Sequence, residues 1–314
     1  MNDRMNLKKK ARNPMSPAKK KVLAAVTAVI VVALIVGGIK IYPIAANSIT
    51  AVQAYTTDLS DQIRGNLAMI PNGNEELNAV VYQPNDGEVH PLVIVSHGFL
   101  VSHKDPLIIT IAEHLRNQGM SVITFDFNGH GDSYGEIIDM TISKEVSDVA
   151  AVVDYAKTLD NVSDIYLVGH SQGGLVTSLY AGEHPDSVEG IVLLSPAANA
   201  HDQTVSGRLL TERFDAENPP EYVELNGGFK IGKGYITDAQ NLDVYNTAKN
   251  YKGNVLLLWG SLDIIVPKSV VEAYDNIYEN AAYSKVDGAS HTYMQKLDEV
   301  AEMVTGFIKD ADIS

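Results

Sequence analysis

The sequence contains no cysteine, and basic side chains are scarce: its 314 residues include 24 Lys and Arg against 39 Asp and Glu. The lack of cysteine excludes a disulfide scaffold, a thiolate zinc site and a cysteine nucleophile. A formal net charge of −15 argues against a nucleic-acid-binding protein, because affinity for phosphates needs a face rich in Lys and Arg. The hydrophobic content of 45% argues against disorder and fits a globular domain with a deep core.

The few basic residues are concentrated at the N-terminus. Residues 1–21 carry eight basic side chains and one acidic side chain, so the rest of the chain has a formal charge of −22. The 18 residues from Val22 to Ile39 contain no charge. As a helix they would measure about 27 Å, close to the hydrocarbon thickness of a bilayer. We therefore expect a basic cytoplasmic segment over residues 1–21 and a transmembrane signal-anchor helix over residues 22–42 that contacts the lipid bilayer.

The charge on either side of this segment predicts its orientation. The positive-inside rule places the N-terminus in the cytoplasm and the domain after a stalk or linker (residues 43–65) outside, in a single-pass protein of the cell membrane. Two other interpretations stay open. A signal peptide cleaved near Ala45 and Ala46 would give a secreted protein, and a buried helix would give a soluble one. The length of the apolar run and its lack of a polar face favour the anchor.

From residue 66 to residue 314, short apolar runs alternate with amphipathic stretches. This pattern is typical of the α/β class, with a mostly parallel sheet flanked by helices. Helices are expected at Ile109–Asn117 and Ser143–Leu159. Strands are expected at Asn78–Gln83, Leu92–Ser96, Ser121–Asp126, Ile165–Val168, Gly190–Leu194, Val255–Trp259 and Ala282–Lys285.

One connection in this pattern is too long for a single crossover helix. More than fifty residues separate Ser195 from Gly253, and we expect an insertion at about residues 199–250 to form a lid subdomain. Within it, the Asn226-Gly227-Gly228 turn between two short apolar segments predicts a β-hairpin.

The strongest chemical signal is the sequence Gly169-His170-Ser171-Gln172-Gly173. It lies between an expected strand and an expected helix, which is the context that a G-x-S-x-G nucleophile elbow requires. The sharp turn exposes the serine hydroxyl, and the helix N-terminus directs backbone donors and a positive dipole toward developing negative charge. We therefore predict that Ser171 is a nucleophile.

A serine hydroxyl needs a base and an orienting carboxylate, which in this class follow the serine in the order Asp or Glu, then His. Asp263 and His291 each come just after an expected strand, in that order. The carboxyl ends of parallel strands share one edge of the sheet, so we expect Ser171, Asp263 and His291 to converge as a catalytic triad. Taken singly, Asp263 would be a turn residue or a helix cap, and His291 a loop residue.

An oxyanion hole needs two backbone N–H groups directed at one point. The loop His97-Gly98-Phe99 follows an expected strand, so the N–H groups of Phe99 and Gln172 are the predicted donors. The side chain of His170 is expected to point away from the reacting centre, and His130 to be structural. The remaining histidines lack a paired metal-binding spacing, and the glycines near residue 130 do not open a helix, so no metal, dinucleotide or other cofactor is expected.

These motifs together resemble the α/β-hydrolase superfamily and, more narrowly, the bacterial cinnamoyl or feruloyl esterases, from about Asn66 to the C-terminus. The narrower resemblance rests on Ser195-Pro196-Ala197-Ala198 and on Phe214–Asn218 in the expected lid. The resemblance implies hydrolysis of a carboxylic ester, on a small molecule or linked to a polysaccharide, beneath an inserted lid. Tyr222, Phe229 and Tyr235 are candidates for substrate binding, although they would equally suit an ordinary lid core. The only tryptophan, Trp259, lies on a core strand instead.

Two other functions stay open from the sequence. One is another acyl hydrolase of the same fold, such as a lipase, a thioesterase or a serine aminopeptidase-like enzyme. The other is a non-catalytic surface or interaction protein on a hydrolase scaffold. The complete set of triad and oxyanion residues favours an enzyme, and the sequence gives no expectation for the oligomeric state.

Overall fold

The computed structural model of the protein describes residues 65–312. The expected basic segment at 1–21, the transmembrane helix at 22–42 and nearly all of the stalk at 43–65 lie outside these residues. Within residues 65–312, no helix is both long enough and apolar enough to cross a bilayer.

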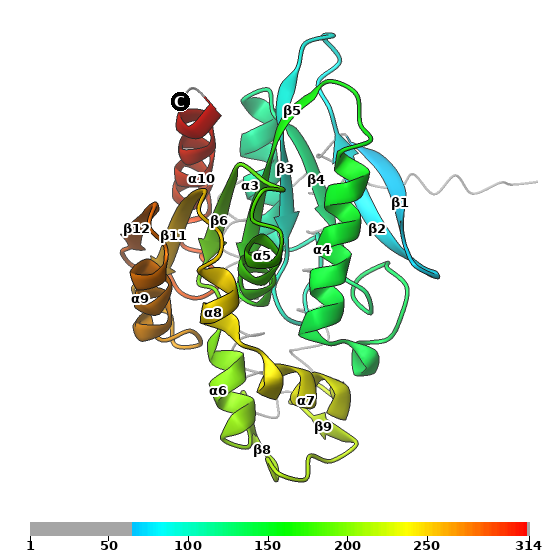
Figure 1. Ribbon diagram of the computed structural model, residues 1–314, viewed down its shortest axis with the longest axis vertical. Helices are drawn as coiled ribbons and strands as arrows, with labels where there is room; N and C mark the ends of the chain where they lie inside the picture. The colour runs from blue at the N-terminus through cyan, green and yellow to red at the C-terminus, as the bar shows by residue number, and fades with distance from the viewer. Residues whose placement is uncertain (1–64, 313–314) are drawn as a thin grey trace, which may run out of the picture.

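A single eight-stranded sheet forms the centre of the described chain, in the order β1-β2-β4-β3-β5-β6-β11-β12 (Figure 1). The two pairs at one edge, β1 with β2 and β2 with β4, are antiparallel, and all other neighbouring pairs are parallel. The predicted mostly parallel sheet is therefore confirmed. The strands span Asn66–Asn72 (β1), Glu75–Tyr82 (β2), His90–Ser96 (β3), Ser121–Phe125 (β4), Val162–His170 (β5), Gly190–Leu194 (β6), Asn254–Gly260 (β11) and Ala281–Val286 (β12).

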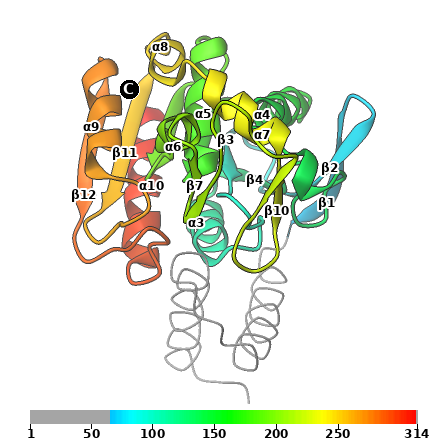
Figure 2. The ribbon, with the colours of Figure 1, turned by 90° about the horizontal axis from the view of Figure 1, so that it is seen from below.

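Helices cover both faces of the sheet (Figure 2). One face carries α3 (Pro106–Asn117) and α10 (Leu297–Asp312), which pack against each other. The other face carries α4 (Ile142–Ala156), α5 (Gln172–Glu183), α8 (Val244–Ala248) and α9 (Lys268–Ile277).

The start of α3 shows why a helix begins where it does. Asp105 accepts a hydrogen bond from the N–H of Leu107, and Pro106 occupies the first turn, where its missing N–H costs nothing.

The two layers of the core follow from the alternation of side chains along each strand. On β3, Leu92 and Ile94 pack in the layer of α4 and α5, whereas Val93 and Val95 pack in the layer of α3 and α10. All four side chains are fully buried. Burial of an aliphatic side chain stabilises a fold by about 1.5–3 kcal/mol, so a strand that is apolar on both sides belongs in the middle of the sheet.

The chain leaves the sheet at the end of β6, and from residue 199 it forms a separate layer of short elements, seen at the bottom of Figure 1 and in front of the strands in Figure 2. We call residues 199–241 the insert. The predicted hairpin is confirmed, because β9 pairs with β10 in antiparallel register. The next helix, α8, packs on α5 and α9 and so belongs with the main body. The insert contains α6 (Asn199–Val205), β7 (Arg208–Leu209), β8 (Glu212–Arg213), β9 (Tyr222–Glu224), β10 (Lys230–Gly232) and α7 (Lys233–Asn241).

Candidate active site

Ser171 lies in the tight turn between β5 and α5. Its backbone has a positive φ of 55° with a ψ of −118°, a conformation that residues other than glycine rarely adopt. The neighbouring glycines make this turn possible. A Cβ on Gly173 would lie 2.3 Å from the carbonyl oxygen of His97, and a Cβ on Gly169 would lie 2.3 Å from that of Gly173. The turn thus holds the serine at the carboxyl edge of the sheet, directly before the helix.

The structure brings Ser171, His291 and Asp263 together in one chain of hydrogen bonds. The Nε2 atom of His291 lies 2.9 Å from the Ser171 Oγ, and its Nδ1 lies 2.8 Å from the Asp263 Oδ2. These residues follow β5, β12 and β11, which end at the same edge of the sheet. With Nδ1–H donated to the carboxylate, Nε2 of the neutral imidazole is free to accept the serine proton.

Asp263 is held in its ionised form. Its Oδ1 accepts the N–H groups of Ile265 and Val266, both at 2.9 Å, while Oδ2 faces His291. Burial alone would raise the pKa of this carboxyl. The hydrogen bond and charge of His291, together with the backbone donors, outweigh burial and hold the pKa of Asp263 below its usual value.

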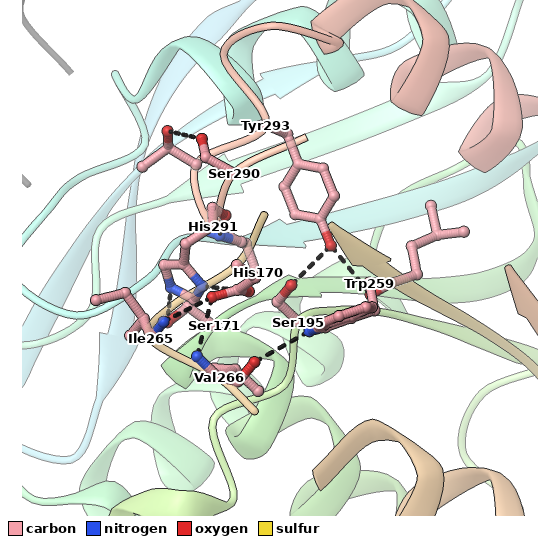
Figure 3. Close-up of polar contacts among 12 residues, drawn as sticks. His170, Ser171, Ser195, Trp259, Ile265, Val266, Ser290, His291 and Tyr293 are labelled. Atoms are coloured by element: carbon pink, nitrogen blue, oxygen red, sulfur yellow. Dashed lines mark hydrogen bonds and ion pairs between the residues drawn. The ribbon is translucent and has the colours of Figure 1, made fainter. Parts of the chain in front are cut away.

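A second set of bonds fixes the loops that carry these groups. The Tyr293 hydroxyl lies 2.8 Å from the Ser195 Oγ and donates to the carbonyl of Leu258 at 3.0 Å. The Trp259 indole N–H donates to the carbonyl of Val266, also at 3.0 Å. Figure 3 shows these contacts linking the loops after β6, β11 and β12, so the imidazole and the carboxylate sit on braced segments rather than on free loops.

The expectation that His170 points away from the centre is wrong. Its imidazole packs on that of His291 with ring centroids 5.0 Å apart, and its Nε2 donates to the carbonyl oxygen of His291 at 2.9 Å. Burial lowers the pKa of His170 to about 3, so the ring is neutral at neutral pH. Because the bond runs to the backbone of the His291 loop, His170 supports that loop and leaves the His291 side chain free.

The two residues predicted to supply the oxyanion donors line the same cavity as Ser171. Gln172 is the first residue of α5, whose first N–H groups have no partner within the helix. Phe99 is in the loop after β3, and a Cβ on Gly98 would lie 3.2 Å from the Ser171 Cβ. The glycine therefore lets this loop come close to the serine. His97 holds the loop, because its Nδ1 donates to the Gly98 carbonyl at 2.8 Å.

A cavity of about 140 Å³ opens beside Ser171 and His291. Most of its wall is apolar, and the insert supplies a large part of it. The insert residues that line the cavity are Asn199, Ala200, Gln203, Leu209, Leu210 and Tyr235; the body contributes others, among them Phe99, Val101, Asp105, Ala197 and Ile265. No spacing rule or motif marks Leu209, Leu210 or Gln203 as wall residues. The one available signal is their position in the long connection after β6.

The three residues predicted to bind substrate lie in different places. Tyr235 lines the cavity and is buried. Tyr222 and Phe229, on and beside the β9–β10 hairpin, are each 41% exposed and are not part of the cavity wall. The structure therefore brings one of the three to Ser171.

Two other buried histidines, His97 in the oxyanion loop and His130 behind it, form a structural pair. The rings of His97 and His130 lie 5.0 Å apart, and burial lowers the pKa of His97 to about 3 and that of His130 to about 4. Both are neutral and point into the core. Among residues 65–312, no three His, Asp or Glu side chains are arranged to hold a metal ion.

Comparison with known proteins places this geometry in a family. A family model described as serine aminopeptidase, S33, matches residues 87–218. The solved structure of Est1E from Butyrivibrio proteoclasticus with ferulic acid bound is 35% identical, with a TM-score of 0.76 over 79% of this chain and 100% of that chain.

Two curated relatives match over shorter stretches. Mouse monoglyceride lipase is 32% identical over 40% of this chain and 41% of its own length. The mouse mitochondrial palmitoyl-protein thioesterase ABHD10 is 25% identical over 61% of this chain and 65% of its own length. The chain thus spans less than two thirds of these curated relatives. The likeness to Est1E, by contrast, covers the whole of that protein and confirms the expected fold. The chain belongs to the α/β-hydrolase superfamily of serine hydrolases and is related to bacterial esterases.

Proposed function

We propose that the protein hydrolyses carboxylic esters through an acyl-enzyme on Ser171. The observation that carries the proposal is the unbroken chain of hydrogen bonds from Ser171 through His291 to Asp263, at the mouth of an apolar cavity. Such a chain is what converts a weakly nucleophilic hydroxyl into an attacking group.

Each residue then has one role. His291 takes the Ser171 proton at Nε2 as Oγ attacks the ester carbonyl, and Asp263 stabilises the imidazolium that forms. The N–H groups of Phe99 and Gln172 stabilise the tetrahedral oxyanion. His291 returns the proton to the leaving alcohol, and a water molecule then repeats the sequence on the acyl-enzyme, releasing the acid and restoring the serine.

The experiment compares Ser171→Ala with the wild-type protein on short p-nitrophenyl esters. We expect hydrolysis to be abolished, while Ser206→Ala, a change at an exposed serine, keeps wild-type activity. A fluorophosphonate probe should label the wild type and not Ser171→Ala. Wild-type activity in Ser171→Ala would refute the assignment, and failure of both hydrolysis and labelling in the wild type would favour a non-catalytic surface protein.

For the acyl group we propose a hydroxycinnamoyl ester, with the insert (residues 199–241) acting as the lid; the expected lid of residues 199–250 is shortened because α8 packs on α5 and α9. The support is an apolar cavity with the rings of Phe99 and Tyr235 on its wall, and the ferulic acid bound to Est1E. The likeness to monoglyceride lipase, to a thioesterase and to the serine aminopeptidase model favours other acyl donors. The test is to measure kcat/KM for methyl ferulate, a monoacylglycerol, an acyl thioester and an aminoacyl amide. A higher kcat/KM for any donor other than methyl ferulate would refute the hydroxycinnamoyl assignment.

We also propose that the catalytic domain is anchored at the outer face of the cell membrane. The support is the uncharged segment from Val22 to Ile39 after eight basic residues. The full chain should fractionate with membranes and its domain should be digested by external protease in intact cells, whereas a chain starting at Ala46 should do neither when made in the cytoplasm. A full chain found in the soluble fraction would contradict the anchor.

A further inference from the structure

The side chain of Gln172, next to the nucleophile, is held at both ends. Its Oε1 accepts a hydrogen bond from the Tyr235 hydroxyl at 2.8 Å, and its Nε2 donates to the Glu145 Oε2 at 2.8 Å. Gln172, Tyr235 and Glu145 are 3%, 2% and 1% exposed. A buried side-chain amide bound on both sides has one orientation, so the first residue of α5 is fixed by groups outside its own turn.

Burial favours the protonated, neutral form of Glu145 in this network. It is on α4, where burial raises its pKa well above the usual value, and the nearby carboxylates of Asp148 and Asp238 raise it further. The nearest imidazole, the buried and neutral His130, is 4.0 Å from its Oε1. The carbonyl oxygen of a neutral carboxyl accepts the Gln172 amide hydrogen without placing an unpaired charge in the core.

Tyr235 reaches both predicted oxyanion residues from the insert. Its hydroxyl binds the Gln172 side chain, and its ring packs on the Phe99 ring with centroids 5.6 Å apart. The two residues that carry the predicted oxyanion N–H groups, Phe99 and Gln172, therefore both contact Tyr235 on α7.

We infer that Tyr235 and Glu145 are positioning residues, which set the orientation of Gln172 and Phe99 and make the insert a structural part of the oxyanion hole. The inference rests on the proposed ester hydrolysis. Its physical basis is that a donor stabilises the oxyanion only when it is aimed at the place where the charge develops, before the reaction begins. Loss of the Tyr235 hydroxyl would leave Gln172 Oε1 unpaired and its side chain held only through the bond of Nε2 to Glu145.

Tyr235→Phe is the direct test, because it keeps the ring on Phe99 and the cavity wall. We expect kcat for a p-nitrophenyl ester to fall about tenfold, less than the loss of an oxyanion donor itself, with KM nearly unchanged. The inhibition constant of a trifluoromethyl ketone, which forms a tetrahedral oxyanion on Ser171, should rise by the same factor. Tyr251→Phe is the matched control: it removes another buried hydroxyl, bound to the Val188 carbonyl, away from the cavity.

Glu145 is tested with a pair of substitutions. Glu145→Gln keeps a neutral carbonyl acceptor and should retain kcat within about twofold, whereas Glu145→Leu removes the acceptor and should show the Tyr235→Phe effect or larger. If Glu145→Leu does not fold, the Tyr235→Phe and Glu145→Gln results decide.

Four outcomes would overturn the inference. Wild-type kcat and ketone inhibition in Tyr235→Phe would remove the positioning role. A change in KM alone would make Tyr235 a substrate contact instead. An equal loss of kcat in Tyr251→Phe would mean that the effect comes from lower stability of the whole fold. A wild-type protein that neither hydrolyses esters nor binds the ketone would refute the proposed function, and the inference would fall with it.

Discussion

Replacing Asp263 by asparagine should shift the imidazole of His291 to the tautomer that carries its proton on Nε2 instead of Nδ1. In the wild type, Oδ1 of Asp263 accepts two N–H groups, from Ile265 and Val266, while Oδ2 accepts Nδ1–H of His291. An asparagine has a single oxygen. Turning its NH₂ group toward the two backbone donors would leave both unsatisfied, at about 1–3 kcal/mol each, so the NH₂ group must face His291 instead.

The consequence for catalysis can be given a magnitude. With NH₂ facing it, Nδ1 of His291 must accept, and the ring proton moves to Nε2, 2.9 Å from the Ser171 Oγ. Nε2 can then no longer take the serine proton. A loss of about 10⁴ in kcat is expected, equivalent to about 5.5 kcal/mol of transition-state stabilisation.

The assay is kcat and KM for a p-nitrophenyl ester, with melting followed by circular dichroism to show that the fold is kept. Nitrogen NMR of His291 reports the tautomer directly. If Asp263→Asn keeps more than about a tenth of the wild-type kcat, or if its proton stays on Nδ1, then Asp263 does not set the tautomer and the reasoning is wrong.

Further predictions concern the free energy of unfolding, measured in urea. Gly182→Ala would place a Cβ 2.1 Å from the Thr247 carbonyl oxygen and should lower this free energy by about 2 kcal/mol or more. Gly306→Ala on α10 meets no neighbouring atom within 4 Å and should raise it by about 0.5–1 kcal/mol, and equal effects of the two substitutions would contradict the packing argument. Burial raises the pKa of Asp148 from 3.8 to about 6, so the folded protein binds its proton more tightly and loses stability as pH rises through that interval. The unfolding free energy of Asp148→Asn relative to wild type should therefore improve by about 2 kcal/mol between pH 4 and pH 6, and a pH-independent difference would show that the carboxyl titrates normally. Tyr293→Phe loses two hydroxyl contacts and should cost about 1–2 kcal/mol in the same unfolding assay; an unchanged value would mean that the loops are braced otherwise.

The sequence predicts the central strands well because their residues are apolar on both sides. Gly190–Leu194 coincides with β6, and the strands expected at Leu92–Ser96 and Val255–Trp259 lie within β3 and β11. The strand β1 was not predicted. Its apolar run from Leu67 to Ile70 is short and ends at Pro71. Leu67 and Met69 are 79% and 45% exposed, so this edge strand lacks the burial on both sides that marks the central strands. The helix expected from Ile109 starts three residues after the first residue of α3, Pro106, because the cap at Asp105 is not part of the apolar pattern.

For the site, motif order led to Ser171, Asp263 and His291, because each of them follows a strand at the same sheet edge. The same reasoning could not find the contact of Glu145 and Tyr235 with Gln172. Glu145, on α4, is 27 residues from Gln172 in the chain, and Tyr235, in the insert, is 63 residues from it. Only the packing of the folded chain brings the three side chains together. His170 was misplaced for a related reason, since the direction of a side chain after a strained turn depends on the loop that it meets.

The path of the insert has a consequence for how substrate preference can vary. Ala198, just before it, and Leu242 to Val244, just after it, line one hollow, so the chain leaves and returns at nearly the same point. The entropy of closing such a loop changes by only about 0.6 kcal/mol when its length doubles. The segment that shapes the acyl cavity can therefore be lengthened, shortened or exchanged at little thermodynamic cost to the sheet, whereas any replacement must still supply the Tyr235 hydroxyl or its equivalent beside Gln172.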